Sequence, residues 1–520
     1  MHPSSETDPL LVLNSALSPT QKSKELLILI VCSILTLSTD FGIFMLNAPQ
    51  TAVFEEIVCR NYQVGLHQTG TGNATLASGT GNALLDPNAC KSEAVQGELA
   101  IVIGYKATFD VIPGLLLSLP YGILSDHWGR KPVLCLCLLG LILGELWVII
   151  VCIWSNYIPL RMVWLSSLFK IIGGGDPVIS TIVCVIIADV FSENERSTAL
   201  FRLNSAAILA EILATPISAY LMTFSLMLPY LLGVGFIVLG TIPVVFLPET
   251  LEDVKLKQSI PEESDRETEQ NTENEPVEQE RGKKEIFREF TRQSREFIES
   301  TRFIWSDSNV CIMILVFFVT IIGRQSTHLL LQYVSKKFDW SIARSSLLIS
   351  LRGIFSLFTY SILMPGLSVL AIRYLNLHGK YRDHLMSKWS GVLSIIGFAA
   401  IFLAPTPAIL ISGQVILSIG SSFLVTTRSL VTALALPDHV GTLYSAIAIA
   451  QSVGVLVAGP LFASLFRLGM HLGDAWMGLP FLQASLFFAL AVTAVWRIRL
   501  APPARAINEE EQESLLPERC

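Results

Sequence analysis

The sequence is poor in charged residues. Only 15% of its 520 residues are Asp, Glu, Lys or Arg, whereas 52% are apolar. An average soluble domain has about 25% charged residues, and so small a share would leave a soluble globule of this length with a very large apolar surface. The composition therefore excludes an ordinary soluble protein and indicates that most of the chain lies in lipid.

The sequence also lacks the residue patterns of catalysis and metal binding. No phosphate loop, no basic nucleic-acid patch and no paired nucleophile and base is visible. The nine cysteines have no metal-type spacing. Six lie in apolar segments, where they are typical of small buried hydrophobic side chains: Cys32, Cys135, Cys137, Cys152, Cys184 and Cys311. We expect no enzyme activity, metal, cofactor or nucleic-acid partner.

Long apolar runs are abundant instead. A helix needs about 20 mainly apolar residues to cross the ~30 Å hydrocarbon layer of a membrane. Twelve runs meet this requirement, which predicts an all-α membrane protein. They are Leu26–Ala48, Leu99–Gly122, Pro132–Trp154, Pro159–Val190, Thr198–Met222, Leu226–Leu247, Val310–Tyr333, Ala343–Ile372, Lys388–Ala404, Ala408–Leu436, Thr442–Phe466 and Met477–Ile498.

The order of these runs predicts two six-helix lobes, at 26–250 and 309–498, between a tail (1–25) and an acidic tail (499–520). Lys and Arg gather in the segments that would face the cytosol, so both termini are predicted to be cytosolic. Because no cleavage site follows it, the first run reads as an anchor and not a signal peptide. The linker (251–308) contains a basic amphipathic stretch, 283–302, which we interpret either as a helix on the membrane surface or as a solvated linker helix.

The longest loop predicted outside the cell follows the first run. It carries Cys59, Cys90 and the glycosylation sequon at Asn73. Cysteines on this side of a membrane meet an oxidising compartment, so a disulfide between the two is our hypothesis, although sequence alone cannot show that they are close.

A short motif lies between the second and third runs. It reads Gly122-Ile-Leu-Ser-Asp126-His-Trp-Gly129-Arg130-Lys131. A tight cytosolic turn needs glycine to bend and basic residues to hold it on the inner side, but this does not explain the order of the residues.

The order resembles the signature loop of the major facilitator superfamily, a family of twelve-span secondary transporters. The resemblance implies a cytosolic charge latch formed by Gly122, Asp126, Gly129, Arg130 and Lys131 together with Asp189, Glu193 and Arg196 after the fourth run. The corresponding loop 373–384 lacks the pattern, so we do not expect a symmetric latch in the second lobe. More narrowly, the chain resembles the proton-coupled folate transporter branch and its filamentous-fungal relatives, through its outer-loop cysteines, Glu211, His328, Arg428 and the segment 47–60.

Ionisable residues within the predicted spans are the main candidates for function, because each costs about 2.5–3.5 kcal/mol to insert at the bilayer centre. The first lobe holds all the carboxylates, including Asp40, Asp176 and Glu211, and the second holds only basic groups. An arginine cannot lose its proton, so it needs a carboxylate from the other lobe or an anion. We therefore predict that the substrate binds to Arg324, Arg352, Arg428, Asp40 and Asp176; static salt bridges between helices are the alternative.

Proton coupling requires a group whose pKa can move toward neutrality. Glu211 is the first candidate, followed by Asp40 and His328. Arg324 and His328 are four residues apart, so we expect them to share one helical face, whereas Lys106 and Asp110 at the same spacing favour a local ion pair.

The fourth run contains Gly173-Gly174-Gly175-Asp176-Pro177, which predicts broken helical bonding near the middle of the membrane. A hinge or a cavity lining is one interpretation, and close helix packing is the other.

The resulting functional hypothesis is a proton-coupled secondary transporter of a small organic solute. Export of a fungal secondary metabolite, import of a folate-like anion and a solute sensor without transport are the alternatives. The antiporter glycines are missing around Pro216, so the motifs leave direction open. Acidic dileucines at Leu10, Leu11, Leu515 and Leu516 resemble signals read by sorting adaptors; they add a vacuolar or endosomal membrane as an alternative to the favoured plasma membrane.

Overall fold

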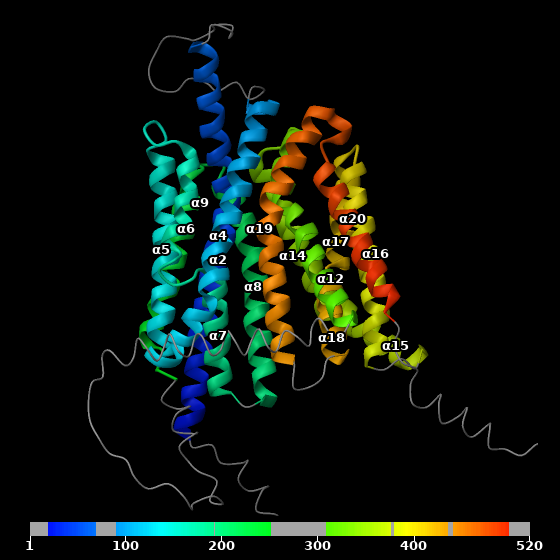
Figure 1. The fold of residues 1–520 in the computed structure, drawn as a ribbon. Coiled ribbons are helices and arrows are strands. Elements are labelled where there is room, and N and C mark those ends of the chain that lie inside the picture. Colours follow the sequence, from blue (N-terminus) through cyan, green and yellow to red (C-terminus); the bar gives the residue numbers. More distant parts are fainter. Residues whose placement is uncertain are drawn as a thin grey trace, which may run out of the picture.

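The computed structural model describes residues 19–68, 90–191, 193–250, 308–375, 379–434 and 440–498. Within these ranges all regular elements are helices (Figure 1). Asn73, the amphipathic stretch of the linker and the dileucines at Leu10, Leu11, Leu515 and Leu516 lie outside the described residues.

The first lobe contains six membrane-crossing segments. They are α2 (Pro19–Gln68), α4 (Glu93–Trp128), α5 (Arg130–Ile153), the composite of η2 (Leu160–Leu165), α6 (Ser166–Phe169) and α7 (Asp176–Val190), α8 (Glu193–Leu221), and α9 (Met227–Thr241) with η3 (Ile242–Phe246).

The second lobe repeats this plan. Its segments are α12 (Ser308–Gln325) continued by η4 (Ser326–Leu329) and α13 (Leu330–Lys337); α14 (Ile342–Phe358), η5 (Thr359–Leu363) and α15 (Met364–Leu375); α16 (Lys380–Leu403); α17 (Pro407–Gly420) and α18 (Phe423–Leu434); α19 (Val440–Leu472); and, after η7 (Asp474–Trp476), α20 (Leu479–Arg497).

Eleven helices of the described residues are long and apolar enough to cross a membrane, and the fourth segment is the exception. It breaks at the glycine triplet, as predicted. Gly173, Gly174 and Gly175 have φ angles of 150°, 81° and 72°, values that L side chains rarely adopt. A Cβ on Gly173 would also overlap the backbone of Cys137, so the break brings this segment against α5. The all-α fold and its two lobes are as predicted.

Several helices are longer than the apolar runs indicated, and α2 and α16 are two of them. Helix α2 does not end near Ala48 but continues to Gln68, so Cys59 lies on a helix and not in a loop. At 1.5 Å per residue its 50 residues extend for about 75 Å, more than the hydrocarbon layer requires. Helix α16 begins at Lys380, eight residues before the predicted Lys388. In both cases polar residues continue a helix beyond the lipid, where hydropathy no longer reports it.

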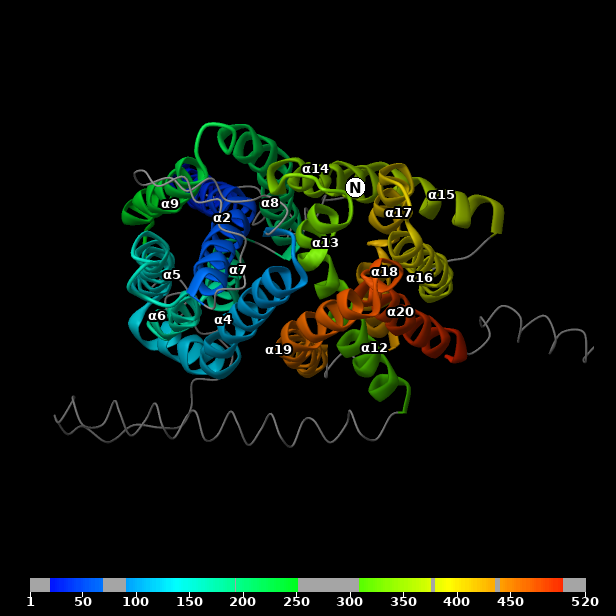
Figure 2. The ribbon, with the colours of Figure 1, turned by 90° about the horizontal axis from the view of Figure 1, so that it is seen from above.

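The lobes meet along two seams, α8 against α14 and α4 against α19 (Figure 2). In the α4–α19 seam Gly104 lies against Gly459, and a Cβ on Gly104 would lie only 2.7 Å from the Gly459 carbonyl oxygen. Close by, the Thr108 hydroxyl donates to the Leu456 carbonyl at 3.2 Å. Small residues therefore allow the two lobes to approach closely at backbone distance.

Candidate functional site

An ion pair joins the lobes in the middle of the α8–α14 seam. Arg352 Nη2 on α14 donates to Glu211 Oε1 on α8 at 2.6 Å. Both residues line a cavity of about 200 Å³ whose other walls come mostly from the second lobe, including Arg324, Tyr360 and several serines. A first-lobe carboxylate thus neutralises a second-lobe arginine across the α8–α14 seam.

Arg324 has a different environment in the same cavity. Its side chain is exposed to the cavity and makes no ion pair or side-chain hydrogen bond with the residues that the structure describes. A guanidinium cannot be neutralised by proton loss, and it lies within a membrane span. The cavity therefore has room and charge for an anionic group.

Arg428 and His328 do not belong to this cavity. Arg428 Nη2 donates to Gln451 at 3.3 Å and lies about 6 Å from the rings of Phe317 and Tyr444. His328 does not share a face with Arg324, because the chain tightens to a 3₁₀ turn at Ser326–Leu329. With three residues per turn, Thr327 lines the cavity with Arg324 instead. The predicted shared face of Arg324 and His328 is therefore wrong, and Arg428 lies apart from the cavity that Arg324 and Arg352 line.

A second cavity, of about 270 Å³, lies in the first lobe. Asp40 on α2 and Asp176 at the start of α7 both line it, with Thr39, Ser180 and Asn204. The glycine triplet positions Asp176, because α7 restarts there after the break. The structure thus brings two predicted site residues together although 136 positions separate them in the chain.

Lys170 joins Asp176 to a buried charge network next to this cavity. Lys106 pairs with Asp110 at 2.8 Å, which confirms the predicted local ion pair. Lys170, only 4% exposed, joins them at 3.5 Å from Asp110 and 3.8 Å from Asp176. Asp40 makes no ion pair with the described residues.

The signature loop forms a charge cluster at the cytosolic end of the first lobe. Arg130, 7% exposed, pairs with Asp126 and, through Nε, with Asp189 at 3.1 Å. Its Nη1 donates to Ser125 at 2.8 Å. Arg196 donates to the Ala188 carbonyl at 2.9 Å, and the Glu193 side chain lies outside the described residues. Helices α4, α5 and α7 are thereby tied together.

Sequence reasoning missed Glu249 in this cluster. Its carboxylate accepts the backbone N–H groups of Arg130 and Lys131 at 2.8 and 3.2 Å, at the N-terminus of α5, where negative charge is favourable. A side chain on Gly129, whose φ is 107°, would lie 2.6 Å from this carboxylate. The sequence feature that could have indicated Glu249 is Pro248-Glu249-Thr250, where the sixth apolar run ends and polar residues begin.

The second lobe has its own charge cluster, which we did not expect. Asp383, 7% exposed, pairs with Arg382 at 2.9 Å and accepts the Ser429 hydroxyl at 2.5 Å. Arg382 also donates to Ser368 at 3.1 Å, so α15, α16 and α18 are joined. The second lobe therefore contains a buried carboxylate after all, in the eight residues by which α16 exceeds its apolar run.

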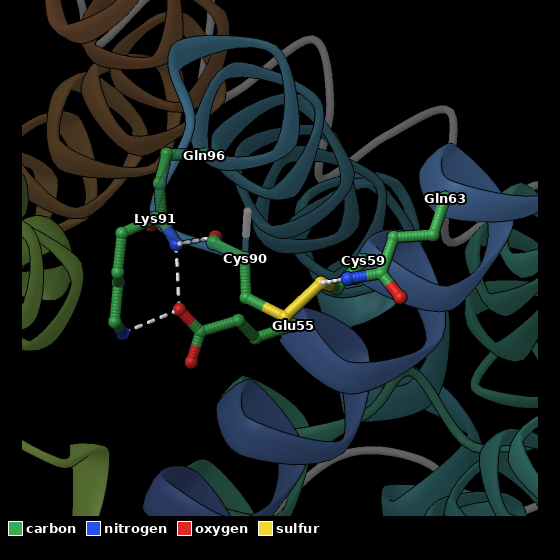
Figure 3. The surroundings of a disulfide bond; sticks show 6 residues. All are labelled: Glu55, Cys59, Gln63, Cys90, Lys91 and Gln96. Carbon is green, nitrogen blue, oxygen red and sulfur yellow. Dashed lines mark hydrogen bonds and ion pairs between the residues drawn. A yellow bond between two sulfur atoms is a disulfide. The ribbon is translucent and has the colours of Figure 1, made fainter. Parts of the chain in front are cut away.

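A disulfide between Cys59 and Cys90 organises the outer end of the first lobe (Figure 3). It joins α2 to the residues just before α4. Beside it, Glu55 accepts Lys91 at 2.6 Å and Gln96 at 2.5 Å.

The same lysine reaches the second lobe. Lys91 Nζ donates to Ser335 at 2.5 Å, and Lys336 donates to the Lys91 carbonyl oxygen. Together with Thr108 and Arg352, these are bonds between lobes at the outer end and the middle of the helices. In the bonds between described residues, each cytosolic charge cluster joins helices of its own lobe. Among the described residues, the two lobes are thus bonded to each other at the outer end and in the middle.

Comparisons with known proteins agree with this fold. The sequence model described as "Major Facilitator Superfamily" matches residues 30–376. The chain is 35% identical to the MFS-type transporter avaK of Aspergillus versicolor, over 93% of this chain and 94% of that protein. It is 34% identical to the MFS efflux pump atnC of Emericella nidulans (88% and 85% covered) and 33% identical to the efflux pump ustT of Aspergillus flavus (90% and 88%).

Solved structures show the same fold at low identity. The nucleoside transporter NupG superposes with a TM-score of 0.59 at 13% identity, covering 91% of this chain and all of NupG. The human organic anion transporter MFSD10 superposes with a TM-score of 0.54 at 16% identity, covering 92% of this chain and all of MFSD10.

Proposed function

Because the chain belongs to the major facilitator superfamily and is a multi-pass membrane transporter, we propose that it exports a small organic solute in exchange for protons. Relatives named as efflux pumps support the direction. The plasma membrane is the proposed location. Small organic products of metabolism, such as fungal secondary metabolites, are the proposed class of cargo.

The observation that carries the proton coupling is the Glu211–Arg352 ion pair between the lobes. Glu211 lies about 15 Å from the outer end of α8, at 1.5 Å per residue, and so near mid-membrane. When ionised it holds Arg352; when protonated it loses the charge that holds the arginine. Proton occupancy therefore changes the bond that closes the middle of the α8–α14 seam, which is what coupling to lobe movement requires.

Metabolite analysis with Glu211→Gln tests this proposal. In a producing strain, deletion of the gene should remove an organic solute from the medium and raise it inside the cells. Glu211→Gln, which keeps the shape and one hydrogen bond to Arg352 but cannot titrate, should give the same result. The matched control Asp339→Asn, on an exposed turn outside both cavities, should export normally.

A flux assay in proteoliposomes then tests whether transport of the solute is coupled to protons. Adding the identified solute on the side where it binds should drive protons the opposite way, as a trapped pH dye reports, and Glu211→Gln should abolish the signal. Normal export by Glu211→Gln would contradict the role of Glu211, and proton movement in the same direction as the solute would contradict exchange.

Import of an organic anion with protons is the second candidate, favoured by Arg324. An anion that displaced Glu211 from Arg352 would leave the carboxylate free to accept a proton, so the two would move together. The direction of the dye signal distinguishes this function from export.

A further inference from the structure

Each of the two cavities contains one unpaired charge, and the two charges are opposite. Asp40 faces the first-lobe cavity and Arg324 faces the cavity between the lobes. Neither makes an ion pair or side-chain hydrogen bond with a residue that the structure describes, although both lie within membrane spans. An isolated charge in the hydrocarbon region is costly. Arg324 cannot lose its proton and needs an anion that the described residues do not supply, and Asp40 in its ionised form needs a cation.

The two cavities adjoin along one helix. Asn204 and Ala207 line the cavity of Asp40, while Ile208 and Glu211 line the cavity of Arg324. These positions follow the i, i+3, i+4, i+7 spacing of a single face of α8. Asn204 and Glu211 are seven residues apart, which places the two cavities about 10 Å apart along the helix axis.

We propose that the solute is zwitterionic, with an ammonium group bound at Asp40 beside Asp176 and a carboxylate bound at Arg324. This inference rests on the proposed transport function and names its substrate class. The offset of about 10 Å between the two cavities along α8 is close to the length of an extended tripeptide. The middle of such a solute meets apolar side chains in both cavities, among them Ile43, Ile179, Leu417 and Phe398.

The paired charges of the site favour a zwitterion over a simple ion. Glu211 already neutralises Arg352, and Lys170 lies near Asp176, so the remaining charges are one carboxylate and one guanidinium. An organic anion would leave Asp40 without a partner, and an organic cation would leave Arg324 without one. A solute with both charges satisfies both groups at once.

The test uses tri-leucine and its two end-blocked forms as probes of the full-length protein in nanodiscs. N-acetyl tri-leucine lacks the positive charge, and tri-leucine amide lacks the negative charge. Thermal stabilisation titrations give the three affinities. We expect each blocked form to bind about tenfold more weakly than free tri-leucine, because each loses one charge-assisted interaction.

Two substitutions connect this selectivity to the residues. Asp40→Asn should make free and N-acetylated tri-leucine bind equally, and Arg324→Gln should make free and amidated tri-leucine bind equally. Asp339→Asn and Arg161→Gln, whose side chains lie on exposed surfaces outside the cavities, serve as matched controls and should retain the selectivity. Because binding is compared between probes on one folded variant, a loss of stability cannot imitate the result.

Equal binding of the three probes, or no binding of tri-leucine, would overturn the two-charge site. That outcome would leave proton exchange standing if the exported solute still drives protons. Conversely, selective binding of tri-leucine by a protein whose solute moves no protons would retain the site and overturn the exchange.

Discussion

The two lobes have the same number of membrane-crossing segments but place their charges differently. The first lobe holds a buried lysine and aspartate network, a signature loop around Arg130, and a disulfide at its outer end. The second lobe stabilises its cytosolic end through Asp383, which is held by one arginine and one serine. Similar helix plans therefore tolerate quite different electrostatic solutions.

Among the substitutions considered, Arg130→Gln in the cytosolic cluster of the first lobe should lower the stability most. This substitution removes the ion pairs that the buried Arg130 makes with Asp126 and Asp189, and we expect a loss of about 3 kcal/mol in the free energy of unfolding. Reversible unfolding in SDS micelles measures it. If Arg130→Gln cost no more than Arg382→Gln, the two clusters would be equivalent and the contrast between the lobes would fail.

Removal of the disulfide should have the next largest effect. Replacing Cys59 and Cys90 together by serine frees a chain segment of 31 residues, and we expect a loss of about 2 kcal/mol. The same SDS titration measures it, and treatment of the wild-type protein with reductant should reproduce it. An unchanged stability would show that Lys91 and its neighbours hold the outer end without the disulfide.

Gly104→Ala should weaken the seam between the lobes and not a lobe itself. The added methyl group would press on the Gly459 carbonyl, an overpacking that we expect to cost about 1.5 kcal/mol. Cysteine cross-linking across the outer seam should show that the arrangement with the lobes in contact there becomes less populated. The control is Gly235→Ala on α9, where a new Cβ meets nothing within 4 Å; an equal response of both variants would contradict a close backbone contact at the seam.

The smallest effect belongs to Arg382→Gln. Its side chain is 29% exposed, and Asp383 keeps the hydrogen bond from Ser429, so we expect a loss of less than about 1 kcal/mol. Asp383→Asn in the same titration shows whether the buried carboxylate itself matters. A loss above that of Arg130→Gln would reverse the comparison between the lobes.

Much of the fold was predictable because lipid imposes simple demands. A helix must be long and apolar to cross the membrane, and eleven helices satisfy that requirement in the structure. The break in the fourth segment was predictable too, because three consecutive glycines and a proline disfavour a helix. The ends of α2 and α16 were not, since polar residues outside the lipid continue a helix without a hydropathy signal.

The site was predictable only as a set of residues. The cost of burying a charge in the membrane singles out Asp40, Asp176, Glu211, Arg324 and Arg352. It does not show which residues they contact. The sequence offered Arg324, Arg352 and Arg428 as candidates, whereas the structure pairs Glu211 with Arg352. Arg428 lies on α18 near Gln451, so its position in the chain said nothing about which arginine faces α8.

The sequence by itself determined that the protein lies in lipid, that it is helical, that it has two lobes and that it belongs to its superfamily. These properties depend on the length of apolar runs and on a local turn motif, which are features of consecutive residues. Apart from local ion pairs such as Lys106–Asp110, only the tertiary structure decided which charges meet. The contacts of Glu249 with α5, of Asp383 with Ser429 and of Lys91 with Ser335 join residues that lie 46 to 244 positions apart. Whether such groups pair depends on the rotation and tilt of packed helices, and so does the contrast between the paired Arg352 and the unpaired Arg324.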